Sequence, residues 1–160
     1  MQGDPAIIEA LNEVLTSELT AINQYFIHHK MCANWGYAKL SQKKREESLE
    51  EMKHADRLIQ RILLLDGLPN LQDLGRIAVG ETVVECLKAD LNLEYEARTA
   101  LVAAVTLCES TKDYVSREIA VEILEDSEEH IDFIETEISL VDKVGEQNYL
   151  QTQIGEGKDP

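Results

Sequence analysis

The chain has few of the residues that interrupt helices, with 8 glycines and 3 prolines among 160 positions. It has no apolar run approaching the roughly 20 residues of a membrane span, and its first residues lack the basic and apolar regions of a signal peptide. Its 3 cysteines, Cys32, Cys86 and Cys108, lack metal-site spacing, so we expect reduced thiols packed as small hydrophobes. These absences argue against a disulfide scaffold and predict a cytoplasmic protein with no membrane partner.

Basic residues are scarce as well. The chain has 15 lysines and arginines against 31 aspartates and glutamates, which gives a net charge of −16. Such a surface repels phosphate backbones, so nucleic acid is not expected as a partner. An acidic balance suits cations, although a solvated anionic surface that keeps the protein soluble explains the same composition. The chain is long enough to bury the core of one folded domain, and its 44% of hydrophobic residues is ordinary for a globular protein. We expect this single domain to span residues 1–160.

Apolar residues recur with the period of a helix in four long segments, and the helix-breaking residues fall between them. Asp4 followed by Pro5 is typical of a helix start, and the first apolar stripe runs from Ile8 to Phe26. No strand pattern competes, so the sequence predicts an all-α fold. The expected helices cover residues 5–33, about 41–65, 82–109 and 113–144, followed by a short fifth helix over 147–154.

The stretch from 66 to 81 contains Pro69, Gly75 and Gly80 but also several leucines, and it is too apolar for a free linker. We expect it to cross the length of the molecule while packed on its side. Such a connection makes the second and third helices parallel, unlike the helices of a simple hairpin. The predicted architecture is a four-helix bundle with one long crossover between helices two and three and a short C-terminal fifth helix.

Acidic and histidine side chains interrupt the apolar stripes at positions that repeat along the chain. From Glu18 to His54 is 36 positions, and from Glu94 to His130 is also 36, so the two halves are related by an offset of 76. On the second helix Glu51 precedes His54 by three residues, which places both side chains on one face. The repeat predicts a bundle with a pseudo-twofold axis.

Three carboxylates and two imidazoles that converge in a core indicate a bound metal, because a lone buried carboxylate is strongly disfavoured. A glutamate from each of two helices, with Glu-x-x-His on the two others, is the arrangement by which ferritin-like bundles hold two metal ions. A single Glu-x-x-His also arises by chance and in surface ion pairs. The duplicated spacing favours the metal site.

The repeat has one defect, at the counterpart of Glu51, where position 127 is a serine. Asp126, Glu128 and Glu129 surround Ser127, but neighbours on a helix point about 100° away, so none takes its inward direction without local rewinding. The three remaining carboxylates supply a charge of −3 against the +4 of two divalent cations. We therefore expect the second ion to be held less tightly than the first.

The chain resembles bacterioferritins over nearly its whole length, in the segments SELTAINQYF (17–26), NWG (34–36), EMKHAD (51–56), GLPNLQDLG (67–75), EEHID (128–132) and NYLQ (148–151). The resemblance implies a ferritin-like bundle in a hollow, octahedrally symmetric shell that stores ferric mineral. It also implies a di-iron ferroxidase centre within each subunit, haem b between pairs of subunits, and a ferredoxin as electron donor for iron release. The iron ligands that it implies are Glu18, Glu51, His54, Glu94 and His130, and Ser127 occupies the sixth, bridging position.

Met52 matches the haem ligand of this family, to which each of two symmetry-related subunits contributes one methionine. It lies one position after Glu51, about 100° further round the helix, so it faces a different neighbour from the metal site. Without the resemblance, Met52 would be expected to fill the core.

Other polar residues lie near the expected site. Tyr25, seven residues after Glu18, can hydrogen-bond a ligand carboxylate or be an ordinary core tyrosine. His28 and His29 are expected at the surface or as support for the metal ligands. A carboxylate cluster on the second helix either lines the inner surface of the shell and nucleates mineral or is solvated surface, and it comprises Glu46, Glu47 and Glu50.

The resemblance implies iron storage and detoxification, and three hypotheses remain open. In the first, a haem-bearing storage subunit with an impaired ferroxidase centre co-assembles with a related active subunit. In the second, the site still oxidises iron in a homo-oligomer, with water or a displaced Asp126 or Glu128 completing the ligands. In the third, a helical-bundle interaction protein keeps its polar core residues as relics and binds neither iron nor haem. A DNA-protecting mini-ferritin is disfavoured by the charge of −16 and by ligands that lie within one chain.

Overall fold

In the computed structural model, the described residues 1–155 form five helices and no strand, which confirms the all-α fold. The second helix begins three residues before the expected Ser41, and the last five residues of the domain expected over 1–160 lie outside the described residues. No helix among the described residues is long and apolar enough to cross a membrane. The helices are α1 (Pro5–Asn34), α2 (Ala38–Leu64), α3 (Val83–Thr111), α4 (Tyr114–Val144) and α5 (Glu146–Thr152).

Local signals in the sequence set the helix ends. Asp4 caps α1 by accepting a hydrogen bond from the Ala6 amide at 2.8 Å, with Pro5 in the first turn as expected. Asp113 caps α4 in the same way, and Lys112 ends α3 in the left-handed region with a φ of 62°. A tight turn between α3 and α4 follows from these two adjacent residues.

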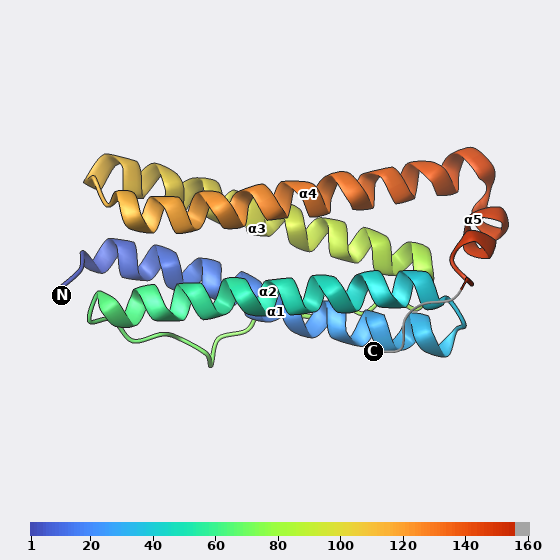
Figure 1. Ribbon diagram of the computed structural model, residues 1–160, viewed down its shortest axis with the longest axis horizontal. Helices are drawn as coiled ribbons and strands as arrows, with labels where there is room; N and C mark the ends of the chain where they lie inside the picture. Colours follow the sequence, from blue (N-terminus) through green and yellow to red (C-terminus); the bar gives the residue numbers. More distant parts are fainter. Residues whose placement is uncertain (156–160) are drawn as a thin grey trace.

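The four long helices form two antiparallel pairs, α1 with α2 and α3 with α4, and α5 lies across one end (Figure 1). The segment between α2 and α3 runs back along the bundle, so these two helices point in the same direction (Figure 1). The predicted long crossover and the parallel arrangement that it requires are confirmed.

The crossover is attached to α1 differently from the sequence expectation. Its leucines Leu68, Leu71 and Leu74 do not pack inward but are exposed. Polar side chains on one face of α1 hold the backbone instead, which satisfies buried amides and leaves the leucines facing outward. The hydrogen bonds run from Asn70 N to Asn12 Oδ1 (2.8 Å), Gly75 N to Thr20 Oγ1 (2.8 Å), Ala78 N to Gln24 Oε1 (3.0 Å) and Gly80 N to His28 Nε2 (3.0 Å).

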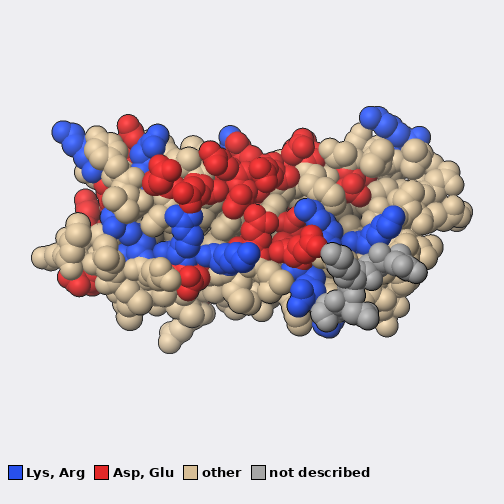
Figure 2. Space-filling view, viewed as in Figure 1, with Lys and Arg blue, Asp and Glu red and all other residues tan. Residues whose placement is uncertain are grey.

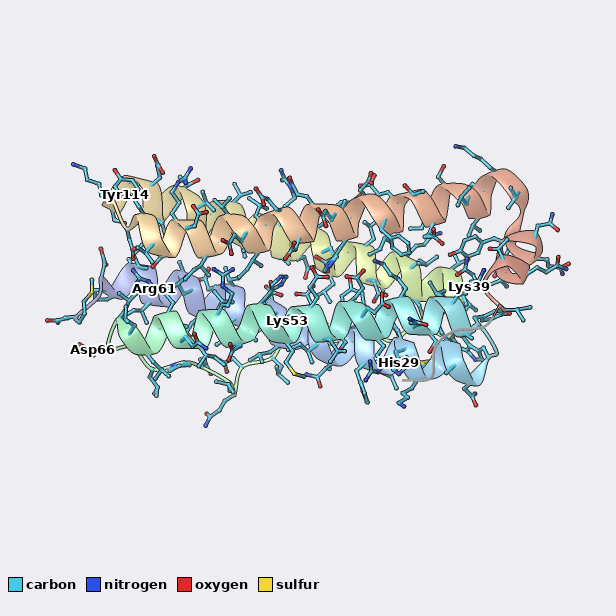
Figure 3. All side chains as sticks on the ribbon, viewed as in Figure 1. His29, Lys39, Lys53, Arg61, Asp66 and Tyr114 are labelled. Atoms are coloured by element: carbon cyan, nitrogen blue, oxygen red, sulfur yellow. The ribbon has the colours of Figure 1, made fainter. Side chains whose placement is uncertain are left out.

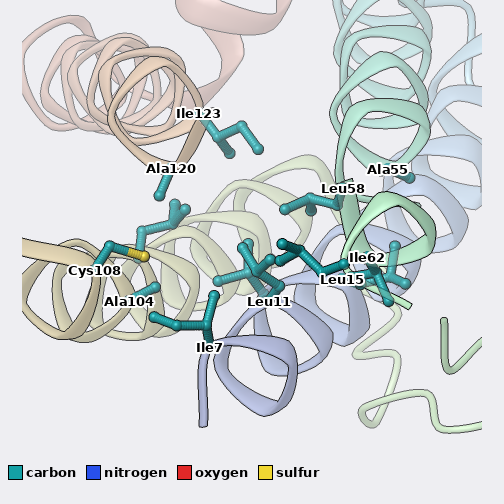
Figure 4. Packing of buried hydrophobic residues seen from close by; sticks show 13 residues of the cluster. Ile7, Leu11, Leu15, Ala55, Leu58, Ile62, Ala104, Cys108, Ala120 and Ile123 are labelled. Atoms are coloured by element: carbon teal, nitrogen blue, oxygen red, sulfur yellow. The ribbon is translucent and has the colours of Figure 1, made fainter. Parts of the chain in front are cut away.

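The apolar core of the described residues comprises two larger clusters along the bundle and a small one of Ala21, Tyr25 and Leu93. Figure 4 shows the larger cluster, to which all four long helices contribute, among them Leu11, Leu58, Ala104 and Ile123. The second cluster lies toward α5. It contains Cys32, Leu40, Val83, Leu87, Ile134 and Tyr149. The three cysteines are free and buried, as expected.

One expected member of the α1 stripe is not in the core. Phe26 is exposed, whereas its neighbour Tyr25 is 1% exposed and points inward. Because successive helical residues are separated by about 100°, only one of the two can face the core at this level. The polar Tyr25 takes the inward position since its hydroxyl has a buried partner, described below.

A buried polar network joins three helices beside the second cluster. Asp90 on α3 accepts hydrogen bonds from Lys44 Nζ at 2.5 Å and Gln24 Nε2 at 2.8 Å, and His28 Nδ1 lies 2.8 Å from the same carboxylate. Because His28 Nε2 accepts from the Gly80 amide, its ring proton is assigned to Nδ1. The expectation of a surface position for His28 is therefore wrong, and the residue connects the crossover to the core.

His29 is also buried, at 3% exposed, so the surface expectation is wrong for it too. Its Nδ1 lies 2.8 Å from Ser41 Oγ and 2.9 Å from the Ser41 carbonyl oxygen, which joins the end of α1 to the start of α2 (Figure 3). Neither histidine contacts the residues of the expected metal site. His28 has Asp90 and Gly80 as partners, and His29 has Ser41.

Replacing Lys44 by methionine is expected to lower the free energy of unfolding by about 3 kcal/mol, because it leaves the Asp90 carboxylate buried without its ion pair. Urea titration at fixed protein concentration measures the loss. Lys44→Met combined with Asp90→Asn is expected to cost less than the sum of the two single changes. An additive double variant would show that the two residues do not interact.

The stabilisation by this ion pair is expected to depend on pH. Despite burial, Lys44 and His28 hold the pKa of Asp90 below its ordinary value of 3.8, and Asp90 raises the pKa of Lys44 above 10.5 against the effect of burial. The contribution of Asp90 is therefore complete above pH 3.8 and is lost as the pH falls through its lowered pKa. The stability difference between the native protein and Lys44→Met should shrink on acidification, and a constant difference down to pH 2 would contradict this assignment.

Candidate metal centre

The five residues singled out by the sequence repeat meet between the two apolar clusters, halfway along the bundle. Each of the four long helices contributes, and in Figure 3 Lys53 marks the turn of α2 that carries His54. All five side chains are buried, with exposures of 2 to 5%. They are Glu18 on α1, Glu51 and His54 on α2, Glu94 on α3 and His130 on α4.

The carboxylates form two groups, one around each histidine. Nδ1 of His54 lies 3.3 Å from Glu18 Oε2 and 3.2 Å from Glu51 Oε2. Nδ1 of His130 lies 3.1 Å from Glu51 Oε1 and 3.1 Å from Glu94 Oε1. Glu51 therefore belongs to both groups, with one oxygen toward each imidazole. Two groups of one nitrogen and two carboxylates can each hold a divalent cation.

The electrostatics of the centre are dominated by its acidic groups. Burial opposes protonation of His130, but hydrogen bonds with surrounding glutamates raise its pKa well above the ordinary value. Burial and the charge of Glu51 raise the pKa of Glu94. Glu51 itself keeps a lowered pKa, because its close contacts with both imidazoles outweigh burial. The arrangement demands positive charge, which either imidazolium groups or metal cations can supply.

At position 127, where the repeat has its defect, the serine side chain makes a hydrogen bond within the centre. Ser127 is buried, and its Oγ donates to Glu94 Oε2 at 2.8 Å. The Tyr25 hydroxyl donates to Glu94 Oε1 at 2.7 Å, which is one of the two roles that the sequence left open for this tyrosine. Glu94 is thus oriented by two hydroxyl donors. Where the repeat requires a second bridging carboxylate, the chain provides a neutral donor.

The acidic neighbours of Ser127 do not take its place. Asp126 Oδ2 lies 2.7 Å from His54 Nε2, on the side of the ring opposite to the inner carboxylates. Glu128 is exposed and pairs with Arg98 at 2.8 Å. This arrangement agrees with the expectation that helix geometry turns both residues away from the inward direction. Asp126 fixes the orientation of a candidate ligand, as carboxylates beside metal-bound histidines do.

The three glutamates of the acidic cluster on α2 differ in burial, and the surface position expected for Glu47 is wrong. Glu46 is exposed and Glu50 half-buried, but Glu47 is only 4% exposed and lies against Nε2 of His130. The sequence placed all three at the surface because the polar face of a helix is hard to delimit from its composition. Acidic side chains gather at the middle of the face formed by α2 and α4 (Figure 2).

Met52 does not fill the core, since it is 52% exposed on α2. Leu49, one turn earlier on the same face, is 41% exposed. A thioether and an apolar side chain are thus presented together at the surface, away from the buried carboxylates.

Comparison with known proteins identifies relatives of the whole described bundle. Residues 8–144 match the ferritin-like domain family. The chain is 47% identical over 151 residues to a bacterioferritin from Brucella melitensis, with 94% of each chain covered. It is 49% identical over 149 residues to a bacterioferritin from Mycobacterium leprae, covering 93% of this chain and 94% of that one. A bacterioferritin from Streptomyces coelicolor is 49% identical over 154 residues, covering 96% of this chain and 92% of that one.

Proposed function

The chain belongs to the bacterioferritin family, and on that premise we propose that it is a cytoplasmic iron-storage subunit that assembles into a hollow shell. The observation that carries the proposal is the convergence of three buried carboxylates and two imidazoles from four helices. Buried carboxylates at this density need cations, and mixed oxygen and nitrogen ligands suit Fe(II). The exposed leucines of the crossover supply apolar surface that contacts between subunits can cover.

We propose further that Fe(II) is oxidised at this centre, but inefficiently. Two Fe(II) ions each give one electron to dioxygen or peroxide, and carboxylate bridges hold the ions close enough to share one oxidant. Within the described residues, Glu51 is the one carboxylate that contacts Nδ1 of both imidazoles, while Ser127 supplies no charge. The first ion is held by Glu18, Glu51 and His54, and the second is held weakly.

A second candidate is a storage subunit with no ferroxidase activity of its own that co-assembles with an active bacterioferritin subunit. The hydrogen bond from Ser127 to Glu94 favours it, because it stabilises Glu94 in a position that does not depend on a second bridge. Mixed shells would then oxidise iron at the partner's centres and use the storage volume in common. A ferredoxin remains the proposed electron donor for iron release.

Haem b is the proposed cofactor at the contact between two subunits, with Met52 of each as its ligand. The exposed thioether beside an exposed leucine fits such a group, because a thioether can serve as an axial ligand of haem iron and the macrocycle packs against apolar surface. When bound, haem supplies one-electron transfer across the shell wall. Met52→Leu is expected to reduce the haem content to background, as measured by visible absorbance per subunit, while Met31→Leu should leave it unchanged. Retention of haem by Met52→Leu would contradict the assignment.

Aerobic iron loading tests the storage function. The purified protein is incubated with excess Fe(II), separated by gel filtration and analysed for iron. We expect iron to elute with an assembled shell in large excess over the two ions per subunit that a di-iron centre can hold. Iron at or below that ratio, or a chain that elutes as a monomer, would contradict the proposal.

A further inference from the structure

A stripe of basic side chains runs along α2, on the face that this helix forms with α4. Lysine and arginine side chains gather there between the two helices, beside the acidic middle of the face (Figure 2). The basic stripe consists of Lys53, Arg57 and Arg61, which follow one another at intervals of four residues and therefore share one side of the helix. Lys53 and Arg61 mark its two ends in Figure 3. The stripe is positively charged although the whole chain carries a net charge of −16.

The two arginines of the stripe line a groove between α2 and α4. The groove has a volume of about 290 Å³, close to the lower limit for small-molecule sites. Its walls comprise Arg57, Gln60, Arg61 and Leu64 from α2 and Ile119 from α4. Two guanidinium groups and one amide thus meet two apolar side chains in a space that suits a small polar ligand. The apolar walls lower the local dielectric constant, which strengthens contacts between a guanidinium and an anion.

Arg61 is the most buried cation of the stripe, at 9% exposed. Its Nε donates to Ser116 Oγ at 2.8 Å and its Nη2 donates to Asp113 Oδ1 at 2.8 Å, which fixes the guanidinium against the start of α4. Within the described residues its hydrogen bonds use these two nitrogens, which leaves the two N–H groups of Nη1 for other partners. A fixed, buried arginine with a free pair of donors beside a groove is prepared for an anion from solution.

The other polar groups of the groove also keep donors in reserve. Arg57 contacts Glu122 of α4 through Nη1, and within the described residues its Nε and Nη2 have no hydrogen-bond partner. Lys53 is exposed and has no ion-pair partner in the same part of the chain. Gln60 donates one amide hydrogen to Asp56 Oδ2 at 2.9 Å and keeps the second. The acidic neighbours therefore use only part of the donor capacity that lines the groove.

The internal repeat provides a comparison within the chain. At the offset of 76, the three cations of the stripe correspond to Glu129, Phe133 and Glu137. Glu129 and Phe133 line a groove of α4 together with three further carboxylates. The fold therefore does not require basic residues at these positions, and the equivalent grooves of the two halves carry opposite charge.

From this geometry we propose that the groove between Arg57 and Arg61 is a binding site for a small tetrahedral oxyanion, namely inorganic phosphate. Guanidinium groups match the oxygens of phosphate with paired N–H donors, and a guanidinium that is already fixed loses little freedom on binding. Nη1 of Arg61 and Nη2 of Arg57 supply these donors, and Gln60 supplies an amide hydrogen. Lys53 attracts the anion from solution.

The proposed anion site adjoins the acidic part of the same face. Arg57 also lines a neighbouring groove of about 450 Å³, whose other walls include Glu46, Glu50 and His54. A bound phosphate therefore lies beside groups that attract cations. The site shares no residue with the metal centre, so it does not depend on the proposed iron chemistry.

Calorimetric titration of the iron-free assembled protein with inorganic phosphate, in chloride buffer of constant ionic strength, tests the proposal. We expect one phosphate to bind per subunit. Arg57→Gln is expected to weaken binding by about tenfold or more, since it removes a charge-assisted hydrogen bond. Arg98→Gln is the matched control, because Arg98 is another exposed arginine that pairs with a glutamate of α4, and it should leave the affinity unchanged. Absence of saturable binding, or equal affinities in Arg57→Gln and the native protein, would overturn the site.

Two further measurements locate the anion and identify its source. Arsenate, a tetrahedral analogue with an anomalous signal, is soaked into crystals of the assembled protein, and we expect it within hydrogen-bond distance of Arg57 and Arg61. Arsenate elsewhere, with none in this groove, would overturn the proposal. Adenosine monophosphate should bind more weakly than phosphate, because the groove is small. Tighter binding of this ester would contradict the assignment to free phosphate. Helical circular dichroism verifies that each variant is folded.

Discussion

Replacing Ser127 by glutamate is expected to raise the rate of Fe(II) oxidation by about a hundredfold or more, since loss of a direct ligand costs more than the 10–100-fold of an outer contact. The change restores the repeat, because residue 127 then corresponds in kind to Glu51. It adds a second bridge and brings the ligand charge from −3 to −4 against the +4 of two Fe(II) ions. Stopped-flow absorbance of ferric product after anaerobic loading measures the rate.

Ser127→Gln is the matched control, because it has the size of glutamate without its charge. We expect its oxidation rate to stay near that of the native protein. In the absence of metal, Ser127→Glu should also be less stable than Ser127→Gln, since a further carboxylate is then buried beside Glu94. Similar oxidation rates for the glutamate and glutamine variants would mean that the missing charge does not limit the reaction.

Glu51→Gln is expected to weaken binding at both inner positions by more than about a hundredfold. Glu51 is the carboxylate that contacts Nδ1 of both His54 and His130, so its loss removes one ligand from each group. Anaerobic calorimetry with Fe(II) measures both affinities. Glu96→Gln, an exposed change on α3, should leave them intact. If only one of the two binding events weakens in Glu51→Gln, the residue is not shared between the positions.

The position of Asp126 decides whether this residue can replace the carboxylate ligand that is missing at position 127. A displaced Asp126 was one way in which the sequence allowed a working site, but its carboxylate lies 2.7 Å from His54 Nε2. Moving it toward Glu94 would remove the group that orients His54. Glu128 is held by Arg98 at the surface. Water is therefore the remaining candidate to complete the inner ligands.

Much of the architecture follows from periodicity alone. The helix-breaking residues fall where the helices end, and the apolar crossover requires α2 and α3 to be parallel. The offset of 76 brings the Glu18–His54 and Glu94–His130 pairs to the same level of the bundle. These features depend on local pattern and on chain connectivity, which a sequence displays directly.

The buried polar network was not predicted because its partners are far apart in sequence. His28 and Asp90 are separated by 62 positions, and nothing near His28 distinguishes it from a surface histidine. A signal was nevertheless present, since Asn12, Thr20, Gln24 and His28 recur at multiples of four along α1. Residues four apart share one face of a helix, so this stripe marks a face with polar contacts. Glu47 was misplaced for a related reason, as its burial depends on His130 of another helix.

The central claim is that the inner centre holds its second iron weakly because Ser127 stands where a bridging carboxylate is required. Anaerobic Fe(II) titration of the assembled homo-oligomer, followed by oxygen in stopped flow, tests it most directly. We predict one tight and one weaker Fe(II) per subunit, and a slow ferric rise that does not saturate at two irons. Two equally tight ions and a fast phase that saturates at two irons per subunit would contradict the account.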